Sequence, residues 1–386
     1  MALKFTSKYK ILYITYHPNI GGGETTLLSL LSRLDKKIFK PIVIVTKKGQ
    51  LTKKLKNEKV ETHVVPLNGY LTRILFIPGI SPIGIYNLFK IVQRIKPDLI
   101  HLNHLNLAVY AGIVGKKLKI PVVATAHGSW DSIYFYQDWI NRLFTDKIFA
   151  STPQIKKRLI KRGIVPPSQV NIIPFGIDLN IFKPGNKIAA KKKFGFLKND
   201  KVITIVGRLD PVKNHLTFLR AADVIGQKIK NARFFIVGSK LGNFSSSSNY
   251  QLTINNYLKK HLLLAKKITF GGFIENMPSV YQASSILVST SAAESFGLTV
   301  IEAAACQVPV VSTESNIIIR NGETGYTVPA KNYLQIADKV IKLCKNPILA
   351  KNFGRIARKR VSEHLPIEFY SNKTEKIYKQ LMTKKN

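Results

Sequence analysis

The sequence has few cysteines and no long apolar run, and each shortage excludes a class of protein. Cys306 and Cys344 are its only two cysteines, lie in apolar surroundings and lack metal-ligand spacing. A disulfide scaffold or cysteine metal site is therefore excluded, and a reduced, cytoplasmic setting is expected. No apolar stretch reaches membrane-spanning length. Because the first residues lead directly into a strand pattern, no signal peptide is expected either.

Acidic residues are scarce. The chain has 21 Asp and Glu against 60 Lys and Arg, a formal net charge of +39, and 45% of its 386 residues are hydrophobic, as in a folded protein. The positive charge is spread over both halves and is mostly lysine. A nucleic-acid surface is more often clustered and arginine-rich, so nucleic-acid binding is a weaker alternative. Contact with phosphorylated ligands or with the anionic face of a membrane fits better.

Two domains of one kind are predicted. The length exceeds what one core usually supports, and apolar strands alternate with helical patterns in both halves, which is typical of doubly wound parallel sheets in α/β proteins. Strands are predicted at 10–16, 41–46, 97–103, 121–127, 147–152 and 170–175, then at 201–207, 233–239, 267–272, 285–291 and 308–313. We place the domains at 1–180 and 181–366, followed by a helix within 367–386. The serine-rich stretch 242–250 is predicted to be a mobile surface loop.

Four strands are followed by polar or glycine-rich turns, at 17–24, 127–131, 208–214 and 292–297. Ligands bind at the carboxyl ends of strands in open parallel sheets. In the first turn, the glycines at 21–23 open a helix, whose amides and dipole can hold a phosphate. The alternative is an ordinary tight turn. In the third turn, Arg208 and Lys213 suit a diphosphate, and the alternative is a solvated basic turn.

The segment "ESFGLTVIE" places Glu294 and Glu302 eight residues apart. In a continuous helix they would be about 12 Å apart, farther than the roughly 5–9.5 Å between the acids of glycosidases. We interpret them as gripping an elongated ligand, with Glu294 on sugar hydroxyls and Glu302 on a ribose. Two solvated helix glutamates are the alternative, but the apolar flanks disfavour it because a buried carboxylate requires a partner.

Together these features resemble the family 4 retaining glycosyltransferases, whose GT-B fold has two facing Rossmann-like domains. The resemblance covers nearly the whole chain. It is carried by "ESFGLTVIE", "VGRLDPVKN", "GGGE", "AHG", "PFGIDLNIFKP" and "NGETGYTVP". It implies an N-terminal acceptor-binding domain, a C-terminal nucleotide-sugar-binding domain and a C-terminal helix that crosses back.

The resemblance also implies the site. Glu302 binds the ribose, and Arg208 and Lys213 hold the diphosphate. Glu294 holds the donor sugar together with the amides of Phe296, Gly297 and Leu298. Gly21 and Gly22 touch the β-phosphate side, and His127 lies near the reacting centre, although a structural histidine is the alternative. The donor is a nucleotide diphosphate sugar, and no metal or other cofactor is required; the sequence has no D-x-D pair.

Some positions depart from the family pattern. Phe175 stands where the family commonly has Asn, Gln307 stands where glycine is usual, and the loop that follows is short. That loop approaches the nucleotide in relatives, so base recognition is the property most affected by the change.

The predicted activity is transfer of a sugar, with retention, to the hydroxyl of a glycan or lipid-linked acceptor in cell-envelope polysaccharide synthesis. Aromatic residues at 130–139 and the apolar stretch 70–89 are candidates to contact the acceptor or a membrane, or else they pack in the core. The alternatives are a phosphorylase or epimerase of the same fold, an impaired nucleotide-sugar-binding module, and a nucleic-acid binder. The sequence does not identify the sugar, base, acceptor or oligomeric state.

Overall fold

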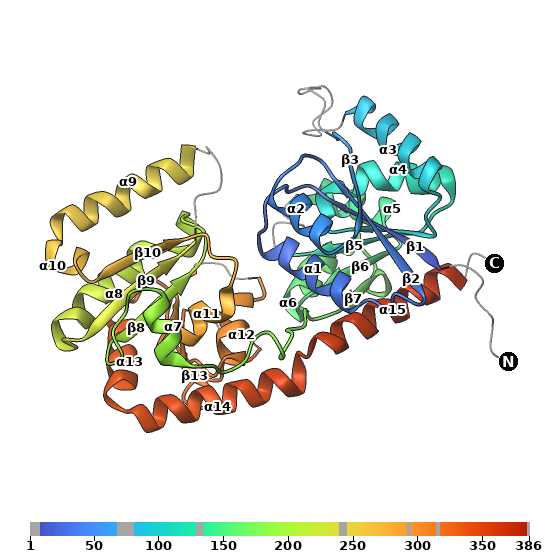
Figure 1. The fold of residues 1–386 in the computed structure, drawn as a ribbon. Helices are drawn as coiled ribbons and strands as arrows, with labels where there is room; N and C mark the ends of the chain where they lie inside the picture. Colours follow the sequence, from blue (N-terminus) through green and yellow to red (C-terminus); the bar gives the residue numbers. More distant parts are fainter. Residues whose placement is uncertain are drawn as a thin grey trace. The chain divides into compact units, whose positions relative to one another are not determined.

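The computed structural model describes residues 8–67, 81–128, 134–238, 245–291, 295–313 and 317–383. The chain forms two compact units (Figure 1). The first unit contains Met1–Gly176 and Ile367–Asn386, and the second contains Ile177–Pro366. Each unit is built on a parallel sheet, so the predicted fold class is confirmed. The last helix belongs to the first unit, as the resemblance led us to expect.

The first unit has a sheet of seven strands in the order β3-β2-β1-β4-β5-β6-β7. Its strands are β1 (Tyr9–Thr15), β2 (Phe39–Val45), β3 (Glu61–Val64), β4 (Leu99–Leu102), β5 (Val122–Ala126), β6 (Lys147–Ala150) and β7 (Val170–Ile172). Its α-helices are α1 (Gly22–Arg33), α2 (Gln50–Asn57), α3 (Pro82–Ile95), α4 (Ala108–Leu118), α5 (Phe135–Phe144), α6 (Pro153–Ile160) and α15 (Ile367–Thr383). Two 3-10 turns, η1 (Leu105–Leu107) and η3 (Pro167–Gln169), complete it.

The two faces of this sheet differ in polarity. Strand side chains alternate between faces, and the central strands β4 and β5 are buried along their whole length because helices cover both sides. On one face, apolar residues such as Leu12 and Leu102 join the core formed with α3 and α4. On the other face, His101 hydrogen-bonds Tyr378 of α15 through Nδ1 and Thr125 through Nε2, the latter at 2.7 Å. This polar network attaches the C-terminal helix to the first sheet.

The second unit has a sheet of six strands in the order β10-β9-β8-β11-β12-β13. Its strands are β8 (Lys201–Val206), β9 (Ala232–Val237), β10 (Ile268–Gly272), β11 (Ile286–Ser289), β12 (Val310–Ser312) and β13 (Gly325–Thr327). Its helices are α7 (Lys187–Lys193), η4 (Pro211–Lys213), α8 (His215–Lys228), α9 (Ser245–Lys260), α10 (Leu262–Ala265), α11 (Met277–Ala283), α12 (Leu298–Ala305), α13 (Tyr333–Lys345) and α14 (Pro347–His364). Its main core joins β8, β9 and β11 to α8 and α13.

One local prediction was wrong, and two strands were missed. The serine-rich stretch was predicted to be a loop, but α9 begins at Ser245. The residues after the serines, up to Lys260, have a helical pattern. The helix can extend back through the serines because the helix propensity of serine is only moderately unfavourable. Strands β3 and β13 were missed because β3 is a polar edge strand and β13 has only three residues.

Candidate active site

At the carboxyl edge of the first sheet, a buried carboxylate organises the glycine turn. Glu24 is 2% exposed, accepts a 3.2 Å hydrogen bond from the Gly21 amide through Oε2, and contacts Thr15 and His104 through Oε1 at 3.2 and 2.9 Å. Burial acts to raise the pKa of this carboxyl, but the hydrogen bond and charge of His104, with the charge of His17, lower it overall. Glu24 is therefore held ionised at the start of α1.

This carboxylate already occupies one amide of the glycine run. Helix α1 begins at Gly22 with Gly21 as its N-cap, as predicted. However, the Gly21 amide already donates to Glu24, so a phosphate at this turn would share the helix N-terminus with a carboxylate. The absence of a side chain matters at Gly23, where a Cβ would lie 2.9 Å from Cε1 of His104 and 3.3 Å from Nε2 of His127. The glycine turn and His127 are thus brought together.

His127 directly follows β5 and is held in one tautomer. Its Nε2 donates a 2.7 Å hydrogen bond to the carbonyl of Asn103, which leaves Nδ1 as an acceptor. Its ring stacks on Phe175 with centroids 5.4 Å apart and lies 5.0 Å from the ring of His104. Burial, together with the charge of His104, lowers the pKa of His127 to about 3. The histidine is consequently neutral across the physiological range.

At the carboxyl edge of the second sheet, the two predicted cations flank the short turn η4. Arg208 is largely exposed and forms a 3.1 Å ion pair with Asp210, whose side chain also caps the turn by accepting from the Lys213 amide at 3.0 Å. The Lys213 side chain lies over Gly207, where a Cβ would come within 3.0 Å of its Cγ. The turn therefore presents both cations next to the end of β8.

A threonine joins this basic turn to the next strand end. Thr290, which follows β11, donates through Oγ1 toward the carbonyls of Lys213 and Asn214 at 2.8 and 3.0 Å. The segment that leads to α12 begins here. Gly297 is the N-cap of α12 in the left-handed conformation (φ 78°), Phe296 is 6% exposed, and Leu298 starts the helix. The structure thus places the predicted diphosphate cations beside the end of β11, the strand that precedes α12.

The segment that carries the two motif glutamates is not one continuous helix. The 12 Å separation assumed one continuous helix, but α12 starts only at Leu298 because the backbone turns at Gly297. Glu294 lies outside the described residues.

Glu302 lies inside α12 and has a partner that sequence reasoning missed. It is 6% exposed, and Oε2 accepts a 2.5 Å hydrogen bond from the phenol of Tyr281 in α11. Burial raises the pKa of Glu302 to about 7, while the Tyr281 hydrogen bond acts in the opposite direction. The prediction that this residue is not a solvated helix glutamate is therefore confirmed. A buried acid that titrates near neutrality is typical of a functional site.

The two single-residue departures fit the structure differently. Phe175 is buried, stacks on His127 and makes an edge contact with Tyr370 of α15, 5.6 Å between centroids. Gln307 follows α12 with φ 59°, a conformation that favours glycine. In the loop that follows, residues 314–316 lie outside the described part of the chain. Arg360 donates hydrogen bonds to the carbonyls of Ile317 and Ile318.

Other functional candidates were missed or set aside by sequence reasoning. Glu24 directly follows the glycines at 21–23 and is the third residue of α1. An acidic side chain at this position often caps the helix N-terminus, so the sequence contained a signal for its role. His104 joins the edge cluster and His101 belongs to the α15 network, and neither was selected as a candidate from the sequence. Tyr281 gives no local signal because it is 21 residues from Glu302.

Two family models match this chain, one for each half. "Glycosyltransferase Family 4" matches residues 20–181, and "Glycosyl transferases group 1" matches residues 186–360. The chain is a member of the family 4 glycosyltransferases. It is accordingly a retaining glycosyltransferase that uses a nucleotide sugar as donor.

Relatives with known activities cover different shares of this enzyme. The UDP-Gal:alpha-D-GlcNAc-diphosphoundecaprenol alpha-1,3-galactosyltransferase of Escherichia coli is 27% identical over 89% of this chain and 90% of that protein. The D-inositol 3-phosphate glycosyltransferase of Rhodococcus jostii is 31% identical over 55% of this chain, and the match spans only 46% of that relative's length.

Solved structures support the fold. HepE of Anabaena, crystallised with UDP and glucose, aligns with a TM-score of 0.82 at 18% identity, covering 96% of this chain and 99% of HepE. A glycosyltransferase from Rickettsia africae aligns with a TM-score of 0.78 at 22% identity, covering 97% and 99%. Both are GT-B enzymes in fold, as expected for this glycosyltransferase. In the described part of the chain, no helix has the length and apolarity needed to cross a membrane.

Proposed function

We propose that this glycosyltransferase transfers a hexose from a nucleotide diphosphate sugar to a glycan or lipid-linked acceptor of cell-envelope polysaccharide synthesis. The acceptor class is supported by the Escherichia coli relative, which matches over 90% of its length and is named for a diphosphoundecaprenol-linked acceptor. UDP is the first nucleotide to test, because the name of that relative specifies UDP-Gal. The first unit, near residues 1–180, would bind the acceptor, and the second, near 181–366, the donor.

The donor roles follow the second sheet edge. Glu302 accepts from the ribose hydroxyls, and Arg208 and Lys213 neutralise the diphosphate as the glycosidic bond breaks. The amides at Phe296, Gly297 and Leu298 support the donor, with Glu294 on the sugar. The observation that supports this assignment is the hydrogen bonding of Thr290 to the η4 turn, because it brings the basic turn beside the end of β11, the strand that precedes α12.

The roles of the first unit follow its own edge. Gly21 and Gly22 contact the β-phosphate side of the donor, and neutral His127 offers Nδ1 to a substrate hydroxyl near the reacting carbon. Negative charge develops on the leaving diphosphate, where Arg208 and Lys213 meet it, so the reaction needs no metal ion. The leaving phosphate, rather than a side chain, would then take the acceptor proton in a same-face displacement.

A cytoplasmic enzyme with a lipid-linked acceptor would work at the membrane surface, and α5 has a suitable face. Phe135, Trp139 and Leu143 recur every four residues and are 65%, 48% and 49% exposed. Residues four apart lie on one side of a helix. Arg142 on α5 and Lys116 on the neighbouring α4 add positive charge, which favours an anionic membrane interface.

The decisive experiment is calorimetric titration with UDP, GDP and ADP of the wild-type protein and of Glu302→Gln and Glu302→Ala. Glu302→Gln keeps the side-chain volume and can still accept from Tyr281, so a loss of affinity in this variant is not caused by a cavity. One diphosphate should bind to the wild type and bind at least about tenfold more weakly to both variants. Arg355→Ala, on the exposed face of α14, is the matched control. Absence of binding at millimolar nucleotide would contradict the donor assignment.

A further inference from the structure

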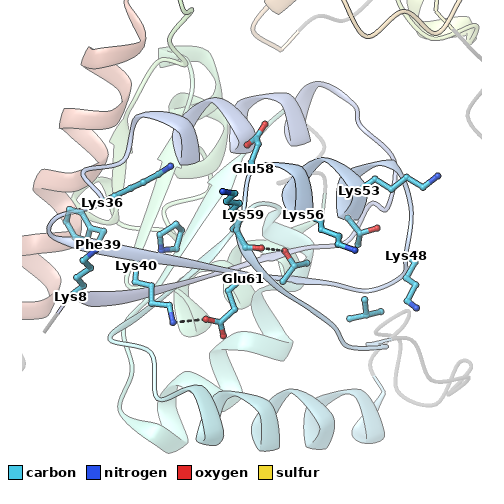
Figure 2. Close-up of a pocket in the computed structure, with 15 residues that line it drawn as sticks. Lys8, Lys36, Phe39, Lys40, Lys48, Lys53, Lys56, Glu58, Lys59 and Glu61 are labelled. Atoms are coloured by element: carbon cyan, nitrogen blue, oxygen red, sulfur yellow. Dashed lines mark hydrogen bonds and ion pairs between the residues drawn. The ribbon is translucent and has the colours of Figure 1, made fainter.

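A lysine-rich hollow lies along the outer edge of the first sheet, over β2, β3 and α2 (Figure 2). Its volume is about 1130 Å³, and seven of its fifteen lining residues are lysines. Lys8, Lys36 and Lys40 lie toward one end, and Lys48, Lys53 and Lys56 toward the other (Figure 2). We call this surface the lysine hollow. It is separate from the edge that carries Glu24 and His127.

The positive charge of the lysine hollow is poorly neutralised. Only two carboxylates, Glu58 and Glu61, are among its lining residues. Glu61 already accepts from Lys40 at 2.7 Å and from His63 at 3.0 Å, and these two contacts lower its pKa. Within the described chain, Lys36, Lys53 and Lys56 form no ion pair, and all three side chains are exposed. Several like charges that face one hollow favour an anionic occupant.

The lysine hollow is elongated and leads to the functional edge. Its lining includes Phe39, Lys40 and Pro41 at the start of β2 and Lys48 beyond its end, and a seven-residue strand extends about 23 Å. At the Lys48 end, the Leu51 amide donates to the carbonyl of Pro18 at 2.9 Å, and Thr46 donates to the carbonyl of Tyr16 at 2.7 Å. These contacts join α2 and β2 to the turn that precedes Gly21. A chain lying in the hollow would therefore point toward the edge that carries His127.

The chemistry of the lining distinguishes between anionic partners. Lysines are separate point charges without the fork with which arginine grips one phosphate, so they suit charges repeated along a chain. A bilayer would require apolar side chains that project from the surface. Here the aromatic ring of Phe39 is fully buried, and Val64 is the one large apolar lining residue among the exposed hydrophobic residues. A concave surface also fits a chain better than a plane.

We propose that the lysine hollow binds an extended polymer with repeated phosphate groups, such as a phosphodiester-linked glycan, with one end directed to the active edge. Binding in the hollow is independent of the donor site. That the bound polymer carries the acceptor hydroxyl rests on the proposed function.

The test measures fluorescence anisotropy of end-labelled inorganic polyphosphate with the full chain at several salt concentrations. The hollow variant is Lys36→Gln/Lys53→Gln/Lys56→Gln. The control, Lys192→Gln/Lys228→Gln/Lys259→Gln, removes the same charge from exposed positions of the second unit. At low salt the hollow variant should bind roughly tenfold or more weakly than the control. Its slope of log affinity against log salt should fall by about two, from three contacts at about 0.7 each.

Four outcomes would overturn the proposal. The first is an equal loss of affinity in both variants, because the effect would then be general charge. The second is that orthophosphate displaces the labelled polyphosphate as effectively as unlabelled polyphosphate does at the same total phosphate concentration. The third is that phosphatidylglycerol vesicles bind more tightly than polyphosphate and lose affinity for the hollow variant. The fourth is the same result with single-stranded RNA. UDP titrated in parallel should bind equally to both variants. If the wild type binds polyphosphate but does not bind UDP, the donor assignment is rejected and the proposal for the lysine hollow is still supported.

Discussion

The phenol of Tyr281 donates a 2.5 Å hydrogen bond to Oε2 of Glu302, in the interior of the second unit. Because burial raises the pKa of Glu302 to about 7, the carboxyl is close to half protonated at neutral pH. Tyr281 keeps its own proton, since burial and the Glu302 charge raise the pKa of the phenol well above its usual value. The protonation state of Glu302 is therefore sensitive to any additional donor.

Nucleotide binding should release protons near pH 7. Ribose hydroxyls that donate to Glu302 favour the charged carboxylate and lower its pKa. At pH 7 about half a proton should leave for each nucleotide bound, and affinity should weaken as the pH falls below 7. Calorimetry in two buffers with different ionisation enthalpies measures this number. Glu302→Gln should abolish the release, and net proton uptake by the wild type would contradict the ribose assignment.

Arg208→Ala should weaken the binding of a nucleoside diphosphate more than the binding of the matching monophosphate. A charged hydrogen bond contributes about 1.5–3 kcal/mol, which corresponds to roughly 10–150-fold in affinity for the diphosphate. Removal of Arg208 also leaves Asp210 without its 3.1 Å ion pair, so its charge would further repel the ligand. The double variant Arg208→Ala/Asp210→Asn tests this second effect and should recover part of the affinity. Equal losses for mono- and diphosphate would place Arg208 away from the β-phosphate.

The first unit should lose stability as the pH falls below about 6.5. Burial lowers the pKa of both His101 and His127 to about 3. Because these folded-state values lie below the unfolded value, the stabilisation is complete above pH 6.5 and decreases as the pH falls toward 3. Between pH 6 and 5 the two histidines together contribute up to about 2.7 kcal/mol per pH unit.

Tryptophan fluorescence is a suitable probe for this effect. Both tryptophans of the chain, Trp130 and Trp139, belong to the first unit. Urea unfolding at pH 7.5, 6 and 5 should show a decreasing midpoint. His101→Asn should reduce the pH slope by about one proton even if the variant is less stable at every pH. A pH-independent midpoint would show that these histidines are accessible to protons in the folded state.

Glu24→Ala should destabilise the first unit by about 1–3 kcal/mol. The substitution leaves the Gly21 amide and the Thr15 hydroxyl without their 3.2 Å acceptor, and it removes the partner of His104. Glu24→Gln retains an acceptor and should lose less than half as much. Glu58→Ala, with only a 4.0 Å pair to Lys54, is the control and should stay within about 0.5 kcal/mol. Equal stability of Glu24→Ala and the wild type would show that the cap is dispensable.

The sequence predicted those features that depend on local pattern. Continuous apolar strands such as 121–127 allowed both parallel sheets to be recognised, and turns after strand ends located Arg208, Lys213 and His127. The apolar flanks of Glu302 correctly indicated a buried carboxyl. Strand β3 could not be found in this way, because an edge strand with an exposed Glu61 has no apolar alternation to detect.

Features that depend on distant residues were not predictable. The partner of Glu302 comes from another helix, and the stacking of Phe175 on His127 joins segments 48 residues apart. The departure at Phe175 was visible in the sequence, but its effect requires the fold: an aromatic ring at this position contributes to burying His127. The contact of His101 with Tyr378 joins the N-terminal and C-terminal segments of the first unit, across 277 residues of the chain.

Gln307→Gly should stabilise the second unit by about 0.5–1 kcal/mol. Gln307 follows α12 with φ 59°, and a residue with a Cβ is strained in this conformation, whereas glycine is not. The gain is limited because glycine also increases the entropy of the unfolded chain. The second unit has no tryptophan, so hydrogen–deuterium exchange of the segment 298–313 is the measurement, and its protection should increase. Lys351→Gly, on the exposed side of α14, has ordinary helical geometry and should cost about 1 kcal/mol instead. Equal destabilisation by both substitutions would mean that side-chain contacts of Gln307 outweigh the strain of its backbone.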